Sequence, residues 1–144
     1  MAHAVKVLPL KVDQAAYLAG LIDGEGTVTL TRMHARESRR LVVSISNNDA
    51  SLLAFVRSVV GAGRITTKRT YSQHHALSFT YQISSRQALD LLQQVVPFLR
   101  TYKRRRALLA LVNYVKLTPR NGRYTQAQGE SRREFERQLL AMKG

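Results

Sequence analysis

Residues 16–26 read AYLAGLIDGEG, and the interpretation of the whole chain starts from this stretch. Its apolar residues have helical spacing, but the end of the helix contains two acids, Asp23 and Glu25, between glycines. The C-terminal end of a helix carries unpaired carbonyl groups and partial negative charge, so a carboxylate there is unfavourable by roughly a few tenths of a kcal/mol. A hard cation such as Mg2+ prefers carboxylate and carbonyl oxygens. The pattern therefore indicates a metal site.

The composition indicates a basic protein with a polyanionic partner. The 144 residues include 23 Lys and Arg against 9 Asp and Glu, which gives a net charge of +14. Nucleic acid is the commonest partner of such a domain, although charge alone does not separate DNA from RNA. The length is that of one domain. We predict a single domain over residues 1–144, with its core at about 13–117 and a C-terminal loop and helix at 118–144.

The sequence argues against disulfides and membrane spans. It contains no cysteine, so neither a disulfide framework nor a thiolate zinc site is available. The N-terminal MAHAVKVLPLK lacks the pattern of a secretory signal, and the apolar stretches at 52–60 and 107–115 are too short to cross a bilayer. We expect a cytoplasmic protein, in bacteria, archaea or an organelle, with no membrane partner and no small-molecule cofactor.

The periodicity of the first half predicts helix and strand in alternation. A helix is predicted from Gln14 to about Gly24, with Asp13 as its N-cap and Gly26 as its C-terminal glycine. Period-two alternation then predicts a hairpin over residues 27–47. The stretch DASLLAFVRSVVGAG predicts a helix that is capped by residue 48 or 49 and ends at the glycine of position 61.

The second half continues this pattern. GRITTKRTY and ALSFTYQIS predict a second hairpin, with alternate apolar residues of the latter on one face. Helices are predicted from Ser84 to Val96, with a capping box at the start, and from Arg100 to Leu117. A second capping box, Ser131 with Glu134, predicts a last helix. The fold class is therefore α+β, an αββαββα core with additional C-terminal helices.

The two hairpins predict a four-stranded antiparallel sheet with helices on one face and solvent on the other. The open face is polar and basic, which suits contact with base edges in a DNA major groove and with phosphates. A half-exposed sheet is polar outside in any protein, so for the threonines the two interpretations carry equal weight. The residues predicted to lie on this surface are Thr27, Thr29, Thr31, Arg40, Ser44, Arg64, Thr66, Lys68, Ser78, Thr80 and Gln82.

The stretch LAGLIDGEG, residues 18–26, resembles the signature of the LAGLIDADG homing endonucleases, and the predicted element order is similar to that family's αββαββα core. The resemblance covers roughly residues 13–117. It implies a site-specific endonuclease that hydrolyses both strands of double-stranded DNA at a long, nearly palindromic target. The implied cofactor is Mg2+, with Mn2+ or Ca2+ able to substitute for binding. Family members that contain one copy of the motif form dimers. This chain contains one copy, so a homodimer is implied.

The small residues of the motif support a dimer independently of the family. Ala16, Gly20 and Gly24 recur every four residues, so they share one helical face that another helix can approach closely. In a homodimer this contact is isologous and brings Glu25 beside its copy. Tight packing inside a monomer is the alternative. The predicted interface consists of Ala16, Leu18, Ala19, Gly20, Ile22, Asp23 and Gly24.

The resemblance also implies the metal-binding residues. Glu25 occupies the second acidic position of the motif, which makes it the implied catalytic carboxylate and direct metal ligand, with the carbonyl of Gly24 as a further ligand. Family members most often have Asp there, so this chain has an additional methylene group. Asp23 lies about 200° round the helix from Glu25. By the resemblance, Asp23 packs or caps rather than binding metal.

Two further catalytic residues are implied by their neighbourhood. Asn47 ends the segment ISN and is expected to order water around the nucleophile. Lys103, in PFLRTYKRRRA, matches the family's catalytic lysine and has an electrostatic role. Arg104 competes with it, and the whole run KRRR is also consistent with a phosphate clamp. Arg32 and Arg104 complete the predicted DNA contacts.

Two other functions stay open. A member of this family that has lost cleavage serves as an intron RNA maturase or a transcription regulator. A basic RNA-binding protein of ribosomal type explains the charge but leaves LAGLIDGEG unexplained. The pair His74–His75 lacks the spaced pattern of a His-metal-finger nuclease and is expected to be solvated.

Overall fold

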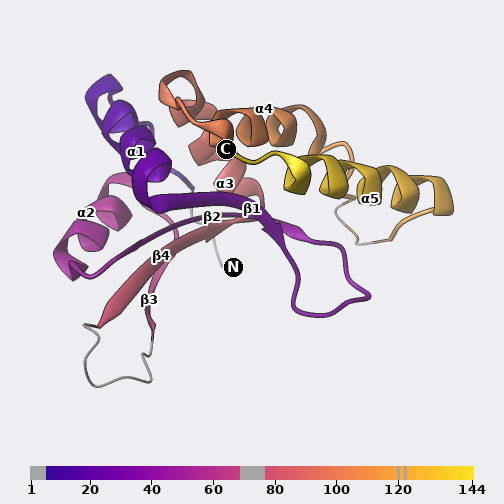
Figure 1. Ribbon diagram of the computed structural model, residues 1–144, viewed down its shortest axis with the longest axis horizontal. Helices are drawn as coiled ribbons and strands as arrows, with labels where there is room; N and C mark the ends of the chain where they lie inside the picture. Colours follow the sequence, from indigo (N-terminus) through magenta and orange to yellow (C-terminus); the bar gives the residue numbers. More distant parts are fainter. Residues whose placement is uncertain (1–5, 69–76, 120, 122) are drawn as a thin grey trace.

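The computed structural model describes residues 6–68, 77–119, 121 and 123–144. In these segments helices and strands follow one another in the predicted order and form one sheet with helices packed against it (Figure 1). The elements are α1 (Val12–Glu25), β1 (Gly26–Thr31), β2 (Arg40–Asn47), α2 (Ala50–Val60), β3 (Arg64–Lys68), β4 (Ser78–Ser84), α3 (Ser85–Val95), the 3-10 helix η1 (Val96–Phe98), α4 (Tyr102–Asn113) and α5 (Gln126–Ala141).

The sheet has four antiparallel strands in the order β1-β2-β4-β3. The two strands of each hairpin, β1 with β2 and β3 with β4, pair with each other. The hairpins join because β2 also pairs with β4. Figure 1 shows α1, α3 and α4 on one side of the curved sheet, with α5 lying beside α4. The α+β prediction, with its four-stranded sheet and helices on one face, is confirmed.

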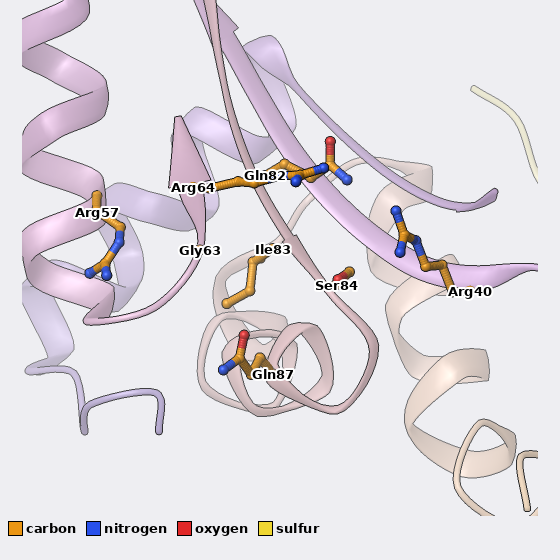
Figure 2. Close-up of a pocket in the computed structure, with 8 residues that line it drawn as sticks. All are labelled: Arg40, Arg57, Gly63, Arg64, Gln82, Ile83, Ser84 and Gln87. Atoms are coloured by element: carbon orange, nitrogen blue, oxygen red, sulfur yellow. The ribbon is translucent and has the colours of Figure 1, made fainter. Parts of the chain in front are cut away.

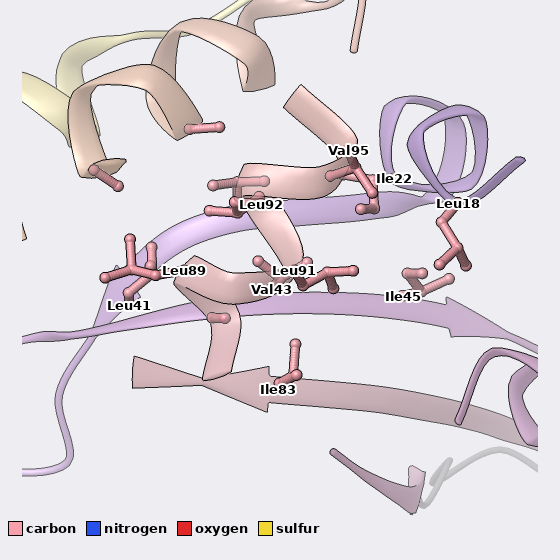
Figure 3. Packing of buried hydrophobic residues seen from close by; sticks show 14 of the residues in the cluster. Leu18, Ile22, Leu41, Val43, Ile45, Ile83, Leu89, Leu91, Leu92 and Val95 are labelled. Atoms are coloured by element: carbon pink, nitrogen blue, oxygen red, sulfur yellow. The ribbon is translucent and has the colours of Figure 1, made fainter. Parts of the chain in front are cut away.

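The core lies between this helical layer and the sheet. Leu18 and Ile22 of α1 meet Val43 and Ile45 of β2, and the leucines of α3 fill the centre of the layer (Figure 3). Period-two alternation places most of the apolar strand residues on the core face, which is why Tyr81 and Ile83 are buried and Phe79 is partly buried. Within the described segments, no helix has both the length and the apolar character that a bilayer crossing requires.

The motif helix α1 differs from the prediction at both ends. It begins at Val12, with Lys11 as N-cap, so Asp13 lies in the first turn rather than at the cap. Gly26 does not adopt a left-handed conformation; its φ is −109° and it already begins β1. A Cβ atom at Gly26 would lie 2.7 Å from the Ile22 Cα atom and 2.9 Å from the Ser44 carbonyl oxygen. Glycine is therefore required there for a close approach of α1, β1 and β2.

The caps of the central helices are mostly as predicted. Asp49 caps α2 by accepting hydrogen bonds from the backbone amides of Ser51 and Leu52, and Gly61 ends α2 with φ of 77°. Ser84 stands at the N-cap of α3, but its side chain makes no capping hydrogen bond. Helix α3 ends at Val95. The part of the predicted strand after Lys68 and the pair His74–His75 lie outside the described residues.

The C-terminal helices differ more. Helix α4 is shorter than predicted and begins after Thr101, whose hydroxyl accepts the backbone N–H of Lys103. Helix α5 begins at Gln126, because an earlier capping box, Thr125 with Gln128, starts it. The prediction that Ser131 and Glu134 start this helix is therefore wrong. Both pairs fit the same pattern, and the earlier pair adds residues 126–131 to the start of the helix.

Candidate active site and nucleic-acid interface

The two acids of the motif point to different surroundings. Asp23 accepts hydrogen bonds from the backbone amides of Arg100, at 2.8 Å, and Thr101, at 3.1 Å, and from the Thr101 hydroxyl. Burial alone would raise the pKa of Asp23, but these hydrogen bonds and the charge of Lys103 lower it overall. The carboxylate thus fixes the segment before α4 to the end of α1. The Asp23 side chain therefore caps the segment before α4 in its own chain.

Glu25 is exposed at the end of α1 and is held by a hydrogen-bond chain. The Asn47 side-chain amide donates to Glu25 Oε2 at 2.5 Å, and the Asp49 backbone N–H donates to Asn47 Oδ1 at 2.8 Å. Because Asp49 is itself the cap of α2, the orientation of the Asn47 amide is fixed by that helix. The other carboxylate oxygen, Glu25 Oε1, accepts no hydrogen bond from the described residues. The structure therefore brings Glu25 and Asn47 together and leaves one carboxylate oxygen available.

Lys103 lies behind this carboxylate, inside the protein. Its side chain is only 8% exposed, and Nζ donates to the carbonyl oxygens of Ile22, at 2.8 Å, and Asp23, at 2.9 Å. Burial lowers the pKa of Lys103, and the negative charge of Asp23 opposes that shift. The ammonium group therefore satisfies two C-terminal carbonyls of α1 and compensates the negative end of its dipole. Arg104, the alternative residue, is exposed on the outer side of α4.

The donor atoms at this end of α1 fit a hard divalent cation in kind but not in number. Glu25 supplies a carboxylate, and Gly24 is exposed immediately before it. Over the described part of the chain, no group of three or more His, Cys, Asp and Glu side chains could hold a metal ion. Oxygen donors of this type suit Mg2+, which also retains water and phosphate ligands. One chain alone therefore offers only part of a coordination shell.

The outer face of α1 presents almost bare backbone. Ala16, Gly20 and Gly24 are exposed, and a Cβ atom added at either glycine would meet nothing within 4 Å. Beside them the rings of Tyr17 and Phe55, which sequence reasoning did not single out, pack edge to face at 5.9 Å and stay half exposed. This face is free for another helix.

Three other residues of the predicted interface lie on the opposite side of α1. Leu18, Ala19 and Ile22 are at most 2% exposed and belong to the core of their own chain. In the single chain these three side chains are already covered, so the predicted interface rests on the other residues. An amphipathic helix has one apolar face, and here the sheet and α3 already cover it.

The open face of the sheet is assembled as the alternation predicts. The strand register places Thr27, Ser44, Gln82 and Arg64 in one row across all four strands. The next row contains Ser46, absent from the prediction, whose hydroxyl hydrogen-bonds that of Thr80 at 2.9 Å. By register, one face contains all the predicted strand positions: Thr27, Thr29, Thr31, Arg40, Ser44, Arg64, Thr66, Lys68, Ser78, Thr80 and Gln82.

The two remaining predicted DNA contacts are not part of this face. Arg32 follows β1, donates from Nη1 to the Ala35 carbonyl at 3.2 Å, and lines a groove beside α5. Arg104 lies on α4, in the helical layer. In the run KRRR, Arg106 is buried as well, and its Nη1 donates to the Val28 carbonyl on edge strand β1 at 2.9 Å. Half of the run is therefore structural.

Comparison with known proteins agrees with this architecture. The chain is similar in fold to the homing endonuclease I-CvuI in complex with its target in the presence of Ca, with a TM-score of 0.74, 16% identity, and coverage of 92% of this chain and 83% of that chain. It is similar to the archaeal intron-encoded homing endonuclease I-Vdi141I complexed with DNA, with a TM-score of 0.67, 16% identity, and coverage of 92% and 85%.

A third similar structure is the LAGLIDADG meganuclease I-AabMI bound to uncleaved DNA. The TM-score is 0.58 and the identity is 21%. The match covers 85% of this chain and 43% of that chain. At these identities the likeness shows the fold. No curated protein matches the chain significantly in sequence.

The family evidence comes from the sequence itself. The family model of the LAGLIDADG-like domain matches residues 13–97, a segment that includes the motif helix, both hairpins and α3. This match covers more than half of the chain and begins beside the N-terminal end of α1. The chain belongs to the LAGLIDADG-like domain family.

Proposed function

We propose that the protein is a site-specific homing endonuclease that cuts both strands of a long, nearly palindromic DNA target as a homodimer with Mg2+. The observation that carries the proposal is the exposed Glu25 carboxylate, oriented by Asn47 at the end of a helix with an uncovered glycine face. The similar structures I-CvuI and I-Vdi141I are complexes with DNA.

The homodimer follows from the incomplete site. Contact between the Gly20 and Gly24 faces of two α1 helices would bring Glu25 beside its copy across a two-fold axis. Two converging carboxylates repel each other unless a cation lies between them. The lengths of the similar proteins support pairing, since this chain covers 83% of I-CvuI but only 43% of I-AabMI, which has room for two such domains.

The residues at the end of α1 then have separate roles. Glu25 and the Gly24 carbonyl would hold Mg2+, and Asn47 keeps Glu25 Oε2 in place while Oε1 stays available. When bound, a divalent ion activates water for attack on phosphorus and stabilises the leaving oxygen. Lys103 is a positioning residue, because its ammonium group holds the carbonyls of Ile22 and Asp23 directly before this site.

The open sheet face supplies recognition. Its rows of hydroxyl, amide and guanidinium groups suit base edges, and the charge of +14 favours phosphate contact. The longest strand, β2, has 8 residues. At about 3.3 Å per residue it extends over about 26 Å, or roughly eight base pairs, so two copies would contact about 16 base pairs.

Sequence-selective binding without cleavage is the alternative, as in a maturase or a transcription regulator. One observation favours it: the Lys103 ammonium already has two carbonyl partners inside the chain, so it is not directed at a phosphate. The two functions share the recognition surface and differ only in what Glu25 does. Cleavage must therefore be measured directly.

The experiment is cleavage of a randomised duplex library by the purified protein with Mg2+, with sequencing of the cut ends. Glu25→Gln is tested in parallel, and Glu130→Gln serves as control because Glu130 is an exposed carboxylate on α5. We expect the wild type and the control to cut one nearly palindromic sequence, whereas Glu25→Gln binds it uncut. DNA cleavage by Glu25→Gln would show that Glu25 is not the catalytic carboxylate. Selective binding without wild-type cleavage would establish the alternative.

A further inference from the structure

The edge of the sheet contains a notch beside β4. Pairing between β3 and β4 ends at Arg64 and Gln82, whereas β4 continues to Ser84, so the last part of β4 has no neighbour on this side. A cavity of about 350 Å³ lies there, between the ends of these strands, α2 and the start of α3 (Figure 2). Its polar lining consists of Arg40, Arg57, Arg64, Gln82, Ser84 and Gln87.

The lining of the notch is strongly cationic. Arg57 comes from α2, Arg64 from β3 and Arg40 from β2, so arginines of three elements line the cavity, with Arg57 and Arg40 on opposite sides of it (Figure 2). No carboxylate lines the cavity. Within the described segments none of these three arginines forms an ion pair or donates a hydrogen bond. Guanidinium groups bind phosphate oxygens through two parallel hydrogen bonds, so a phosphate is the ligand that this lining suits.

The wall between Arg57 and Arg64 is rigid. The Tyr81 hydroxyl is buried and donates to the Ala62 carbonyl at 2.7 Å. Gly63 has φ of 97°, and a Cβ atom there would lie 2.6 Å from the Tyr81 ring. The turn from α2 to β3 is therefore fixed against the core, so the backbone positions of the two arginines on either side of it are set before any ligand binds. Such preorganisation reduces the entropic cost of binding.

The notch also adjoins the surface proposed to contact DNA. Arg64 and Gln82 end the row that crosses the open face through Ser44 and Thr27. We propose that the notch binds the phosphate backbone of duplex DNA, with Arg57 contacting one phosphate and Arg64 and Arg40 supplying further positive charge along the backbone, and this proposal rests on the proposed function. It adds Arg57, a residue of α2, to the interface. Such a contact fixes where the sheet sits on the duplex without reading a base.

The test measures the affinity for a random-sequence duplex by fluorescence anisotropy over a range of salt concentrations. Each neutralised phosphate contributes about 0.9 to the slope of log K against log salt. For Arg57→Gln we expect a loss of affinity on every sequence and a slope smaller by about 0.9. Arg57→Lys, which keeps the charge, should retain the slope. Arg133→Gln is the matched control, because Arg133 is exposed on α5, outside the sheet face and the run KRRR.

The outcomes separate this proposal from the proposed function. If the wild type binds duplex DNA and Arg57→Gln has the wild-type slope, or loses affinity at an unchanged slope, the phosphate contact is wrong although the function stands. Absence of DNA binding by the wild type would refute both. Thermal stabilisation by inorganic phosphate that Arg57→Gln abolishes, at an unchanged DNA slope, would indicate a free-phosphate site instead. If Arg57→Gln does not fold, Arg64→Gln takes its place and must show the smaller slope. Arg64 is exposed on the edge strand β3.

Discussion

Replacing Lys103 by methionine tests whether this residue positions the motif helix. Methionine keeps most of the apolar stem but leaves the carbonyls of Ile22 and Asp23 without their donor. An unpaired buried carbonyl costs about 1–3 kcal/mol, and the half-buried Asp23 carbonyl lies at the lower end of that range. Removing a buried cation whose pKa is lowered by burial returns part of this cost. We expect the free energy of unfolding to fall by about 2–3 kcal/mol.

The assay is urea unfolding at a fixed protein concentration, because dimerisation makes stability depend on concentration. Arg104→Met is the control, since Arg104 is exposed one residue away, and it should change stability by less than about 0.5 kcal/mol. In the cleavage assay, Lys103→Met should lose activity together with stability. A variant as stable as the wild type that no longer cuts would refute the reasoning, because it would show that Lys103 acts directly on the reaction.

Four further predictions concern other residues of the chain. The pKa of Asp23 in the folded chain lies below its ordinary 3.8, so its stabilising contribution is complete above pH 3.8 and is lost as the pH falls further. Urea midpoints should therefore show a constant stability difference between the wild type and Asp23→Asn near neutral pH. This difference should shrink at acidic pH. Gly26→Ala should destabilise the chain by about 1–3 kcal/mol in thermal melts, because its Cβ meets backbone atoms. Gly20→Ala meets nothing in its own chain, so it should not destabilise the fold, yet sedimentation should show a weaker dimer; an unchanged dimer would contradict the α1 interface. Arg132→Met should destabilise the chain by about 3 kcal/mol in calorimetry, at the lower end of the range for a broken buried ion pair, because the buried Glu136 carboxylate loses Arg132 and keeps only Arg39.

Local signals predicted the elements that depend on local chemistry. Asp49 and Gly61 mark the two ends of α2 because capping and a left-handed glycine act within a few residues. Alternation predicted the open sheet face, since strand residues change sides at every step. The start of α5 was missed because Thr125 and Ser131 both begin a capping pattern, and in the structure the capping box forms at Thr125 with Gln128.

The site was predictable in its residues but not in its geometry. Asp23 and Glu25 were expected to differ in role, yet the partner of Asp23, the segment at Arg100 and Thr101, lies far away in the sequence. The burial of Lys103 within a basic run has no local signal, because a run of charges is more often solvated. The side of α1 that faces its own core was likewise decided by tertiary packing.

The divergence of the two motif acids has an evolutionary consequence. Loss of Asp23 would unfasten α4 from α1, whereas loss of Glu25 would remove a contact with Asn47 at the surface. Under the proposed function, mutation at position 25 would abolish cleavage in one step and leave DNA recognition intact, whereas mutation at position 23 would impair both. A lineage that drifts from cutter to regulator should keep the first acid and lose the second. In this chain both acids are retained. Asp23 is the acid on which the fold depends, and Glu25 is the acid that the fold can lose.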